Sequence, residues 1–413
     1  MPGNHASGEG EVAGRALARP STGRWRRRSA RVLIVLLAFV LLGTVAFVTV
    51  APFRAAVRTA SLLPEVLALP IRPLSALTPT PQRVSVTYGE PAERMDIYLP
   101  GGALPDRTRP AVLLALGVHP LPLDHPGVAR VALAVARIGL VVGVPESAEL
   151  RASRIGAHEP GHLVDAYLVL EARPEVRPGR VGIAGFSAGA SLGLMAAGDP
   201  RIAERVAWIN AFGGYGDAAT LMVDTLTRTQ RRDGVVEPWR PNEVARRRLF
   251  EVLLDAIEPA SDRQRLRGEL EPLIAAEERP TPTPDPAFAA SLGEQGRAVY
   301  AIATAASREA AEAVVEGLPP AIHERLRVIS PPAATSNLRG PVLLMHDERD
   351  RAIPVTHLQL LQDALPAGAA RRVTRFRLFE HIEPGAGGVG PDEAPELWRL
   401  FVHLQELVEL ATS

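Results

Sequence analysis

Residues 180–197 read RVGIAGFSAGASLGLMAA, and this stretch decides the fold. Its first six residues have the apolar composition of a buried strand, and its last ten are small and apolar with helical character. Between these parts, Gly185 to Gly189 form the pentapeptide G-x-S-x-G around Ser187. Glycines are needed there because a tight strand-to-helix turn brings neighbouring backbone close and forces the serine into a strained conformation. The stretch therefore predicts a nucleophile elbow with Ser187 at its tip.

Strand and helix patterns alternate on both sides of this elbow. Beta-alpha alternation predicts an α/β fold, with a mainly parallel sheet covered by helices on both faces. The expected strands are residues 84–88, 94–99, 111–117, 140–144, 180–185, 206–209, 342–346 and 373–379. The expected helices are residues 128–138, 162–172, 188–197, 356–364 and 395–410.

The alternation stops after Phe212 and resumes at Val342. The intervening segment is rich in Arg, Glu, Ala and Leu, and its apolar residues recur with helical spacing. We expect a helical insertion at about 213–335. Its aromatic residues Tyr215, Trp239 and Tyr300 are expected to pack, although they are also candidates to line an acyl pocket, and the run of arginines at 246–248 is expected to be a solvated helix face.

The N-terminal region has the pattern of a membrane anchor. Residues 32–53 form a run of 22 uncharged residues, and a spanning helix needs about 20. Five arginines stand immediately before the run, within residues 24–31, so residues 1–31 are predicted to be a basic cytoplasmic tail and the rest of the chain extracytoplasmic. Residues 54–82 are predicted to be a Pro-rich stalk, followed by a catalytic domain at 83–413. A cleaved signal peptide, which would give a secreted protein, is the alternative.

The composition excludes several kinds of chemistry. All 46 basic residues are arginine and the chain has no cysteine, which rules out Schiff-base lysines, P-loops, thiolate nucleophiles and Cys-ligated metals. The basic residues are balanced by 46 acidic ones, and this argues against a nucleic-acid partner. The net charge of zero is the sum of two opposite contributions. Seven Arg and two Glu give residues 1–31 a charge of +5, which leaves −5 for the remaining residues.

One motif points to a metal site. Residues 158–162, HEPGH, match H-E-x-x-H, the zinc-peptidase motif that places both histidines on one helical face. Pro160 and Gly161 are expected to spoil that helix. We therefore predict no metal site here, and the chemistry described next requires no organic cofactor.

A serine nucleophile needs a base and an orienting carboxylate, which follow it along the chain in the order acid, then histidine. Among the histidines after Ser187, only His381 falls in a loop just past a late strand; the others are His323, His346, His357 and His403. For the acid, the loop after Val342–Met345 offers Asp350, with Asp347 as the next candidate. The backbone N–H of Ala188, directly after the nucleophile, is the expected donor to an oxyanion.

These motifs resemble those of the alpha/beta-hydrolase superfamily, particularly its dienelactone-hydrolase-like and prolyl-oligopeptidase-like branches. The resemblance rests on Gly185–Gly189, LLMHDERDRAIP at 343–354 and LFEH at 378–381, in that order after RMDIYLP. It covers about residues 83–212 and 336–413. One departure is Asp347, which follows His346 where many relatives have glycine and which leaves a second carboxylate near the acid.

The resemblance implies a serine hydrolase of this fold in which the helical insertion is a cap. It implies that Ser187 is the nucleophile, Asp350 the acid and His381 the base. It aligns Val118 with the second oxyanion donor, and His119 is the neighbouring possibility. We predict cleavage of a small-molecule carboxylic ester or similar acyl bond, with the bilayer bound through residues 32–53. A serine peptidase of the same fold and a catalytically silent binding protein are the alternatives.

Overall fold

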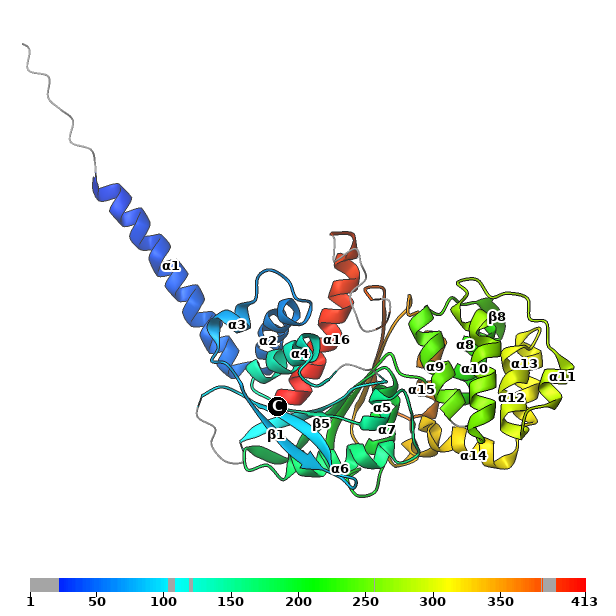
Figure 1. Cartoon of the computed structure of the whole chain (residues 1–413). Coiled ribbons are helices and arrows are strands. Elements are labelled where there is room, and N and C mark those ends of the chain that lie inside the picture. The colour runs from blue at the N-terminus through cyan, green and yellow to red at the C-terminus, as the bar shows by residue number, and fades with distance from the viewer. Residues whose placement is uncertain (1–21, 103–107, 119–121, 256, 380, 382–390) are drawn as a thin grey trace, which may run out of the picture. The chain divides into compact units, whose positions relative to one another are not determined.

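The computed structural model describes residues 22–102, 108–118, 122–255, 257–379, 381 and 391–413 (Figure 1). The chain divides into two compact units, residues 1–54 and 55–413. The first unit contains helix α1 (Thr22–Thr49). Within the described residues, no single helix is long and apolar enough to cross a membrane. Residues 35–49 and the next helix, α2 (Ala51–Val66), pass that test only as a pair with a bend at the break between them.

The second unit is built on an eight-stranded sheet in the order β1-β2-β4-β3-β5-β6-β9-β10. Strand β2 runs antiparallel to both of its neighbours and the other pairs are parallel. All eight expected strands are present, and the chain has the alpha/beta-hydrolase fold. The strands are β1 (Gln82–Tyr88), β2 (Glu93–Leu99), β3 (Arg109–Ala115), β4 (Val141–Pro145), β5 (Val176–Phe186), β6 (Val206–Phe212), β9 (Val342–Asp347) and β10 (Ala370–Phe376).

Helices cover both faces of this sheet, which explains why its central strands are continuous apolar runs. In β3, Leu113 packs into one hydrophobic cluster, whereas Val112 and Leu114 pack into the cluster on the opposite face. The first cluster includes side chains of α6 (Glu159–Glu171), α7 (Ala188–Ala197) and α15 (Thr356–Ala364). The second includes side chains of α4 (Pro126–Arg137) and α16 (Ala394–Thr412). A short helix, α5 (Ala148–Arg151), follows β4.

The segment predicted to be a stalk differs from that prediction. It contains most of α2 and a short helix, α3 (Pro73–Leu77). Ala55, Leu62 and Leu74 are buried in the same cluster as α4 and α16. The prolines of this segment favoured the prediction of a stalk. Pro64 nevertheless lies inside α2 without ending the helix. The second compact unit therefore begins about 30 residues before residue 83, the predicted start of the catalytic domain.

The expected helical insertion lies between β6 and β9, and we call residues 213–335 the cap. Figure 1 shows most of its helices gathered in one lobe beside the sheet. Leu253, Leu266 and Tyr300 belong to a hydrophobic core of its own. Besides helices, the cap contains a two-stranded hairpin that the sequence analysis did not predict. Its elements are α8 (Ala218–Thr227), β7 (Thr229–Arg232), β8 (Val235–Pro238), α9 (Glu243–Asp255), α10 (Ala260–Ala275), α11 (Pro286–Ala290), α12 (Glu294–Ala303), α13 (Arg308–Glu316) and α14 (Pro320–Val328).

Candidate active site

Ser187 lies between the end of β5 and the start of α7, as predicted for a nucleophile elbow. Its backbone angles, φ 55° and ψ −134°, are in a region that L-residues rarely adopt. A Cβ atom on Gly185 would lie 2.4 Å from Ala190 Cα, and one on Gly189 would lie 2.2 Å from Ala115 O. Side chains are therefore excluded on both sides of the serine, which gives the physical reason for the G-x-S-x-G spacing.

The loop after β3 runs against this elbow. A Cβ atom on Gly117 would lie 2.8 Å from Ser187 Cβ and 3.1 Å from Ala188 N. The next residue, Val118, packs against the small apolar cluster that contains Ala188. Ala188 is the first residue of α7, and the first amides of a helix have no partner within it. The structure thus brings together the two residues expected to supply oxyanion donors. His119, the alternative to Val118, is outside the described residues.

Asp350 and His381 form a direct pair. His381 Nδ1 lies 2.8 Å from Asp350 Oδ2, and the carboxylate is fully buried. The backbone amides of Ala352 and Ile353 donate to Asp350 Oδ1 at 2.7 and 2.9 Å. With the Nδ1 proton donated to Asp350, His381 Nε2 is left to act as a proton acceptor.

The ionised form of Asp350 is favoured despite its burial. Burial alone would raise the pKa of this carboxyl, but the charge and hydrogen bond of His381 and a hydrogen bond from His346 hold the pKa below its usual value. His346 Nε2 lies 3.4 Å from Asp350 Oδ2 and 2.9 Å from the carbonyl oxygen of Ile353. His346 therefore supports the loop that carries Asp350, which we call the acid loop, whereas His381 is in the position of the base.

Asp347, the other candidate acid, has a separate set of partners. Its Oδ2 accepts hydrogen bonds from the backbone amides of Leu378 and Phe379, both at 2.6 Å, and its Oδ1 accepts one from Arg349 at 2.7 Å. Burial raises its pKa, and these hydrogen bonds oppose the rise. Asp347 thus fixes the segment after β10, shortly before His381, while Asp350 contacts the imidazole itself.

Two consecutive residues at the end of β6 link the elbow to the Asp350–His381 pair. The Ser187 amide donates to the carbonyl oxygen of Phe212 at 2.8 Å. A Cβ atom on Gly213, whose φ is +64°, would lie 3.4 Å from Asp350 Oδ2 and 3.6 Å from His381 Cε1. The Ser187 elbow contacts Phe212, and the Asp350–His381 pair lies against the next residue, Gly213.

The three aromatic residues of the cap that the sequence singled out pack against neighbouring parts of the chain, as expected. Tyr215 is buried, with its hydroxyl donating to the Ile329 carbonyl oxygen at 2.7 Å, and Tyr300 is buried in the cap core. Trp239 Nε1 donates to the backbone oxygen of Asp350 at 3.0 Å. The cap therefore contacts the acid loop directly through Trp239, and no sequence motif predicted this hydrogen bond.

The arginine run of α9 corrects the expectation of a solvated face. Arg246 is only 4% exposed, and it donates to the carbonyl oxygens of Pro241 and Ile274. Arg248 is half-buried, and its guanidinium donates to the Val118 carbonyl oxygen at 3.3 Å. Burial lowers the pKa of Arg248. The position of Arg248 in the sequence does not predict its contact with Val118, in the loop after β3.

Comparisons with known proteins give distant likenesses only. No family model matches the sequence, and no curated protein matches it. Similar solved structures include dipeptidyl peptidase 4 of Porphyromonas gingivalis, with a TM-score of 0.44 and 13% identity, covering 80% of this chain and 35% of that one. Puromycin hydrolase has a TM-score of 0.47 and 14% identity, and the match covers 83% of this chain and 40% of that one. Acylaminoacyl peptidase of Pyrococcus horikoshii has a TM-score of 0.44 and 12% identity, and the match covers 81% of this chain and 42% of that one. The chain spans less than half the length of each, so its activity has to be inferred from the site.

Proposed function

We propose that this protein is a serine hydrolase that cleaves a carboxylic ester or a similar acyl bond. The observation that carries the proposal is the 2.8 Å contact between His381 Nδ1 and the buried carboxylate of Asp350. This pair lies against Gly213, the residue after the one that binds the Ser187 amide. A nucleophile, a base and a group that orients the base are the three parts that acyl transfer by serine requires.

The proposed reaction has two halves. Ser187 Oγ attacks the acyl carbonyl carbon while His381 Nε2 accepts the hydroxyl proton, and Asp350 stabilises the imidazolium that forms. The protonated His381 then gives this proton to the leaving alkoxide, so that an alcohol departs and an acyl-enzyme remains. Water attacks the acyl-enzyme by the same route and releases the acid. In both halves the N–H groups of Ala188 and Val118 stabilise the oxyanion.

Arg248 is the cap residue that we assign to this machinery. It donates to the carbonyl oxygen of Val118, which belongs to the same residue as the second oxyanion N–H. A hydrogen bond at that carbonyl limits rotation of the adjoining peptide groups. Arg248 is therefore a positioning residue, which acts on the oxyanion through the loop.

Labelling with a fluorophosphonate probe tests the hydrolase proposal. We expect the full chain to react at Ser187, and the Ser187→Ala and His381→Ala variants to remain unlabelled. Ser261→Ala, which changes an exposed serine of α10, is the matched control and should label as the wild type does. A folded wild-type chain that fails to label, or a Ser187→Ala chain that labels fully, contradicts the proposal.

A substrate panel then separates ester from amide cleavage. We expect turnover of p-nitrophenyl esters that disappears in Ser187→Ala. If aminoacyl anilides are cleaved and the esters are not, the protein is a peptidase of this fold. Labelling at Ser187 without turnover of either class would instead support a silent binding protein that retains a reactive serine.

We also propose that the N-terminal apolar segment, residues 32–53 of the sequence, anchors the protein in a bilayer with the catalytic unit extracytoplasmic. In α1, Leu36, Phe39 and Val40 are 55–70% exposed, and large apolar side chains in such a run need a partner that covers them. Alkaline carbonate extraction followed by N-terminal sequencing provides the test. Release of the intact chain into the soluble fraction would contradict anchoring, and a chain starting beyond residue 50 would indicate a cleaved signal peptide.

A further inference from the structure

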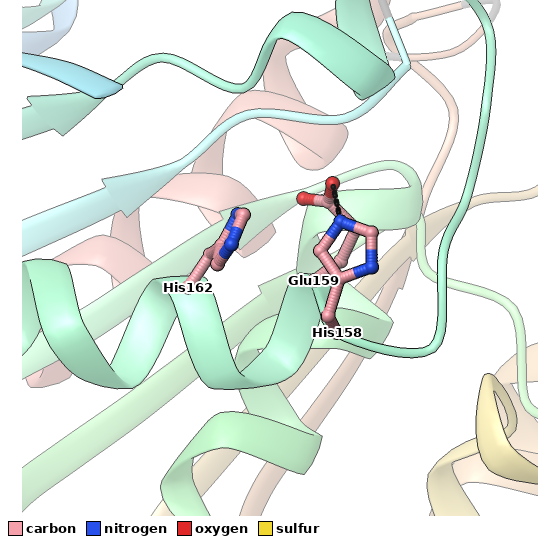
Figure 2. A group of neighbouring side chains, drawn as sticks. All are labelled: His158, Glu159 and His162. Carbon is pink, nitrogen blue, oxygen red and sulfur yellow. Dashed lines mark ion pairs between the residues drawn. The ribbon is translucent and has the colours of Figure 1, made fainter. Parts of the chain in front are cut away.

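The H-E-x-x-H residues lie together at the start of α6, on one side of the helix (Figure 2). His158 precedes the helix but has helical backbone angles, φ −87° and ψ −12°, and its carbonyl oxygen accepts a hydrogen bond from the His162 amide at 3.0 Å. Pro160 occupies the first turn, where its missing N–H is tolerated. The expected breaking of this helix is therefore wrong, and the two imidazole rings lie 4.7 Å apart.

Glu159 completes the group from the helix interior. It is 1% exposed, and the Ser147 hydroxyl donates to its Oε1 at 2.9 Å. His158 Nε2 lies 3.6 Å from the same oxygen and 3.2 Å from Glu149 Oε2. Glu159 thus presents a buried carboxyl oxygen between the Ser147 hydroxyl and the His158 imidazole.

His162 provides the observation that points to a ligand. Its side chain is more than nine-tenths buried, and its Nδ1 atom has no hydrogen-bond partner among the residues that the structure describes. His162 and Glu159 line a cavity of about 20 Å³ together with Ser147, Tyr88 and Gly117. A cavity of this size has room for about one water molecule or ion and excludes an organic molecule.

The loop before α6 is shaped to leave His158 and Glu149 in place. A Cβ atom on Gly156 would lie 2.5 Å from His158 Cε1 and 2.7 Å from Glu149 Oε2. Any larger residue at this position would displace one of the two side chains. Glu149 Oε2 and Glu159 Oε1 both lie near His158 Nε2, so two acidic side chains face this imidazole.

We propose that His158, Glu159 and His162 bind a divalent transition metal ion of the zinc class. Two imidazoles and one carboxylate suit zinc and its neighbours better than magnesium or calcium, which take oxygen ligands. One ligand atom from each residue lies within 4.8 Å of the others, and ligand atoms around a tetrahedral zinc are about 3.3 Å apart. Rotation of His158, whose side chain is 49% exposed, can close that difference.

The proposed ion has a structural role, because the cavity leaves no space for a substrate at its open coordination position. It would join α6 to the loop that precedes this helix. The same cavity is also bordered by Leu116 and Gly117, and Gly117 contacts the Ser187 elbow. The metal would therefore stabilise the cavity next to the loop after β3, which contains Gly117 and Val118.

Metal binding by the full chain tests the proposal. The chain is purified on a tag without histidine, stripped with EDTA and titrated with Zn²⁺ by calorimetry, with Co²⁺ absorption as a report on ligand geometry. We expect one ion per chain, a dissociation constant in the micromolar range or below, and a higher Tm with metal. His162→Gln and His158→Gln should each weaken binding by about 100-fold or more, beyond the 10- to 100-fold effects of outer-shell changes.

Two controls keep the outcome clear. His323→Gln removes an exposed histidine of α14 and should leave binding unchanged. The half-exposed His158 can be replaced with less loss of packing than His162, so its variant tests the site even if His162→Gln does not fold. Absence of saturable binding, or unchanged affinity in His158→Gln, overturns the proposal. Ser187→Ala should bind Zn²⁺ as the wild type does, which separates this test from that of the hydrolase.

Discussion

The sheet and the cap satisfy their buried backbone groups in different ways. In the sheet, strand pairing supplies the partners and aliphatic side chains fill both faces. In the cap, buried arginines bind the carbonyl oxygens at helix ends. Arg228 donates to Leu273 and Ala276, and Arg246 donates to Ile274, so two guanidinium groups complete the C-terminal end of α10.

Arginine suits this task because its planar fork carries five donors and no acceptor. Positive charge at the C-terminal end of a helix also complements the helix dipole. Arg279 repeats the arrangement by donating to Leu226 at the end of α8 and to Ala303 at the end of α12. The difference teaches that the cap combines its hydrophobic core with a few charged side chains at helix ends, whereas strand pairing completes the backbone hydrogen bonds of the sheet.

The largest effect is expected in the sheet region, where two neighbouring carboxylates have different tasks. Asp350→Asn should lower kcat by about 10⁴-fold, because the wrong imidazole tautomer is then held. Asp347→Asn should act mainly on stability, because both carboxylate oxygens accept from backbone amides, so the amide nitrogen of asparagine would face a donor in either orientation. Ester hydrolysis and urea unfolding of both variants provide the measurement. Equal loss of kcat in the two variants would mean that Asp347 shares the role of the acid.

The next effect concerns the charged network that joins the cap to α15. Arg308 pairs with Asp224, and both side chains are at most 3% exposed. Asp224 Oδ2 also lies 3.1 Å from His357 Nε2. Arg308→Met should cost about 3–5 kcal/mol of unfolding free energy, because it leaves Asp224 without its charged partner. Arg297→Met, at an exposed position of α12, is the control in the same urea titration. A loss as small as that of the control would show that the cap does not depend on buried charge.

The sequence predicted the sheet and the site better than it predicted the cap, for physical reasons. The elbow is a local structure, so Gly185, Ser187 and Gly189 specify it within five residues, and the observed bounds of α7 match the predicted helix. The choice of His381 followed from chain order and loop position. The sequence also placed Asp350 ahead of Asp347, and the structure adds the hydrogen bonds that distinguish these two acids, which are three residues apart.

The errors have equally specific causes. The hairpin of the cap was not predicted, although the sequence Asp233-Gly234 is typical of its turn. Both residues have the positive φ that this turn requires. Pro160 was treated as a helix breaker, but its position in the first turn makes it harmless. Burial of Arg246 could not be predicted from α9 alone, because its acceptors Ile274 and Ala275 lie on another helix. Partners that are distant in sequence leave no local pattern.

A moderate effect of pH is expected in the sheet unit. His403 of α16 is buried between Thr374 and Asn210, and burial, with the charge of Arg372 adding to it, lowers its pKa to about 3. Between that value and the unfolded pKa of about 6.5, the unfolded chain binds the extra proton, so stability rises with pH. The contribution of His403 should fall by about 2 kcal/mol from pH 6.5 to pH 5. Urea titrations at both pH values should show a smaller pH difference for His403→Gln. An unchanged pH difference would show that His403 titrates alike in both states.

The smallest effect tests the contact between the cap and the oxyanion loop. Arg248→Ala should lower kcat by about tenfold, because one hydrogen bond to the Val118 carbonyl oxygen is lost, worth about 1–2 kcal/mol. KM should change little if the residue acts through the loop alone. Arg248→Lys should recover part of the rate. A raised KM with unchanged kcat would instead show that Arg248 contacts the substrate.

The strained backbone of Ser187 sets catalysis against thermodynamic stability at one position. A non-glycine residue in such a conformation costs about 1–3 kcal/mol, whereas glycine adopts it without penalty. An inactive Ser187→Gly chain should therefore resist unfolding better than the wild type, and Ser187→Ala, which keeps the Cβ atom, should not. The protein would then be most durable in the form that has lost its proposed nucleophile.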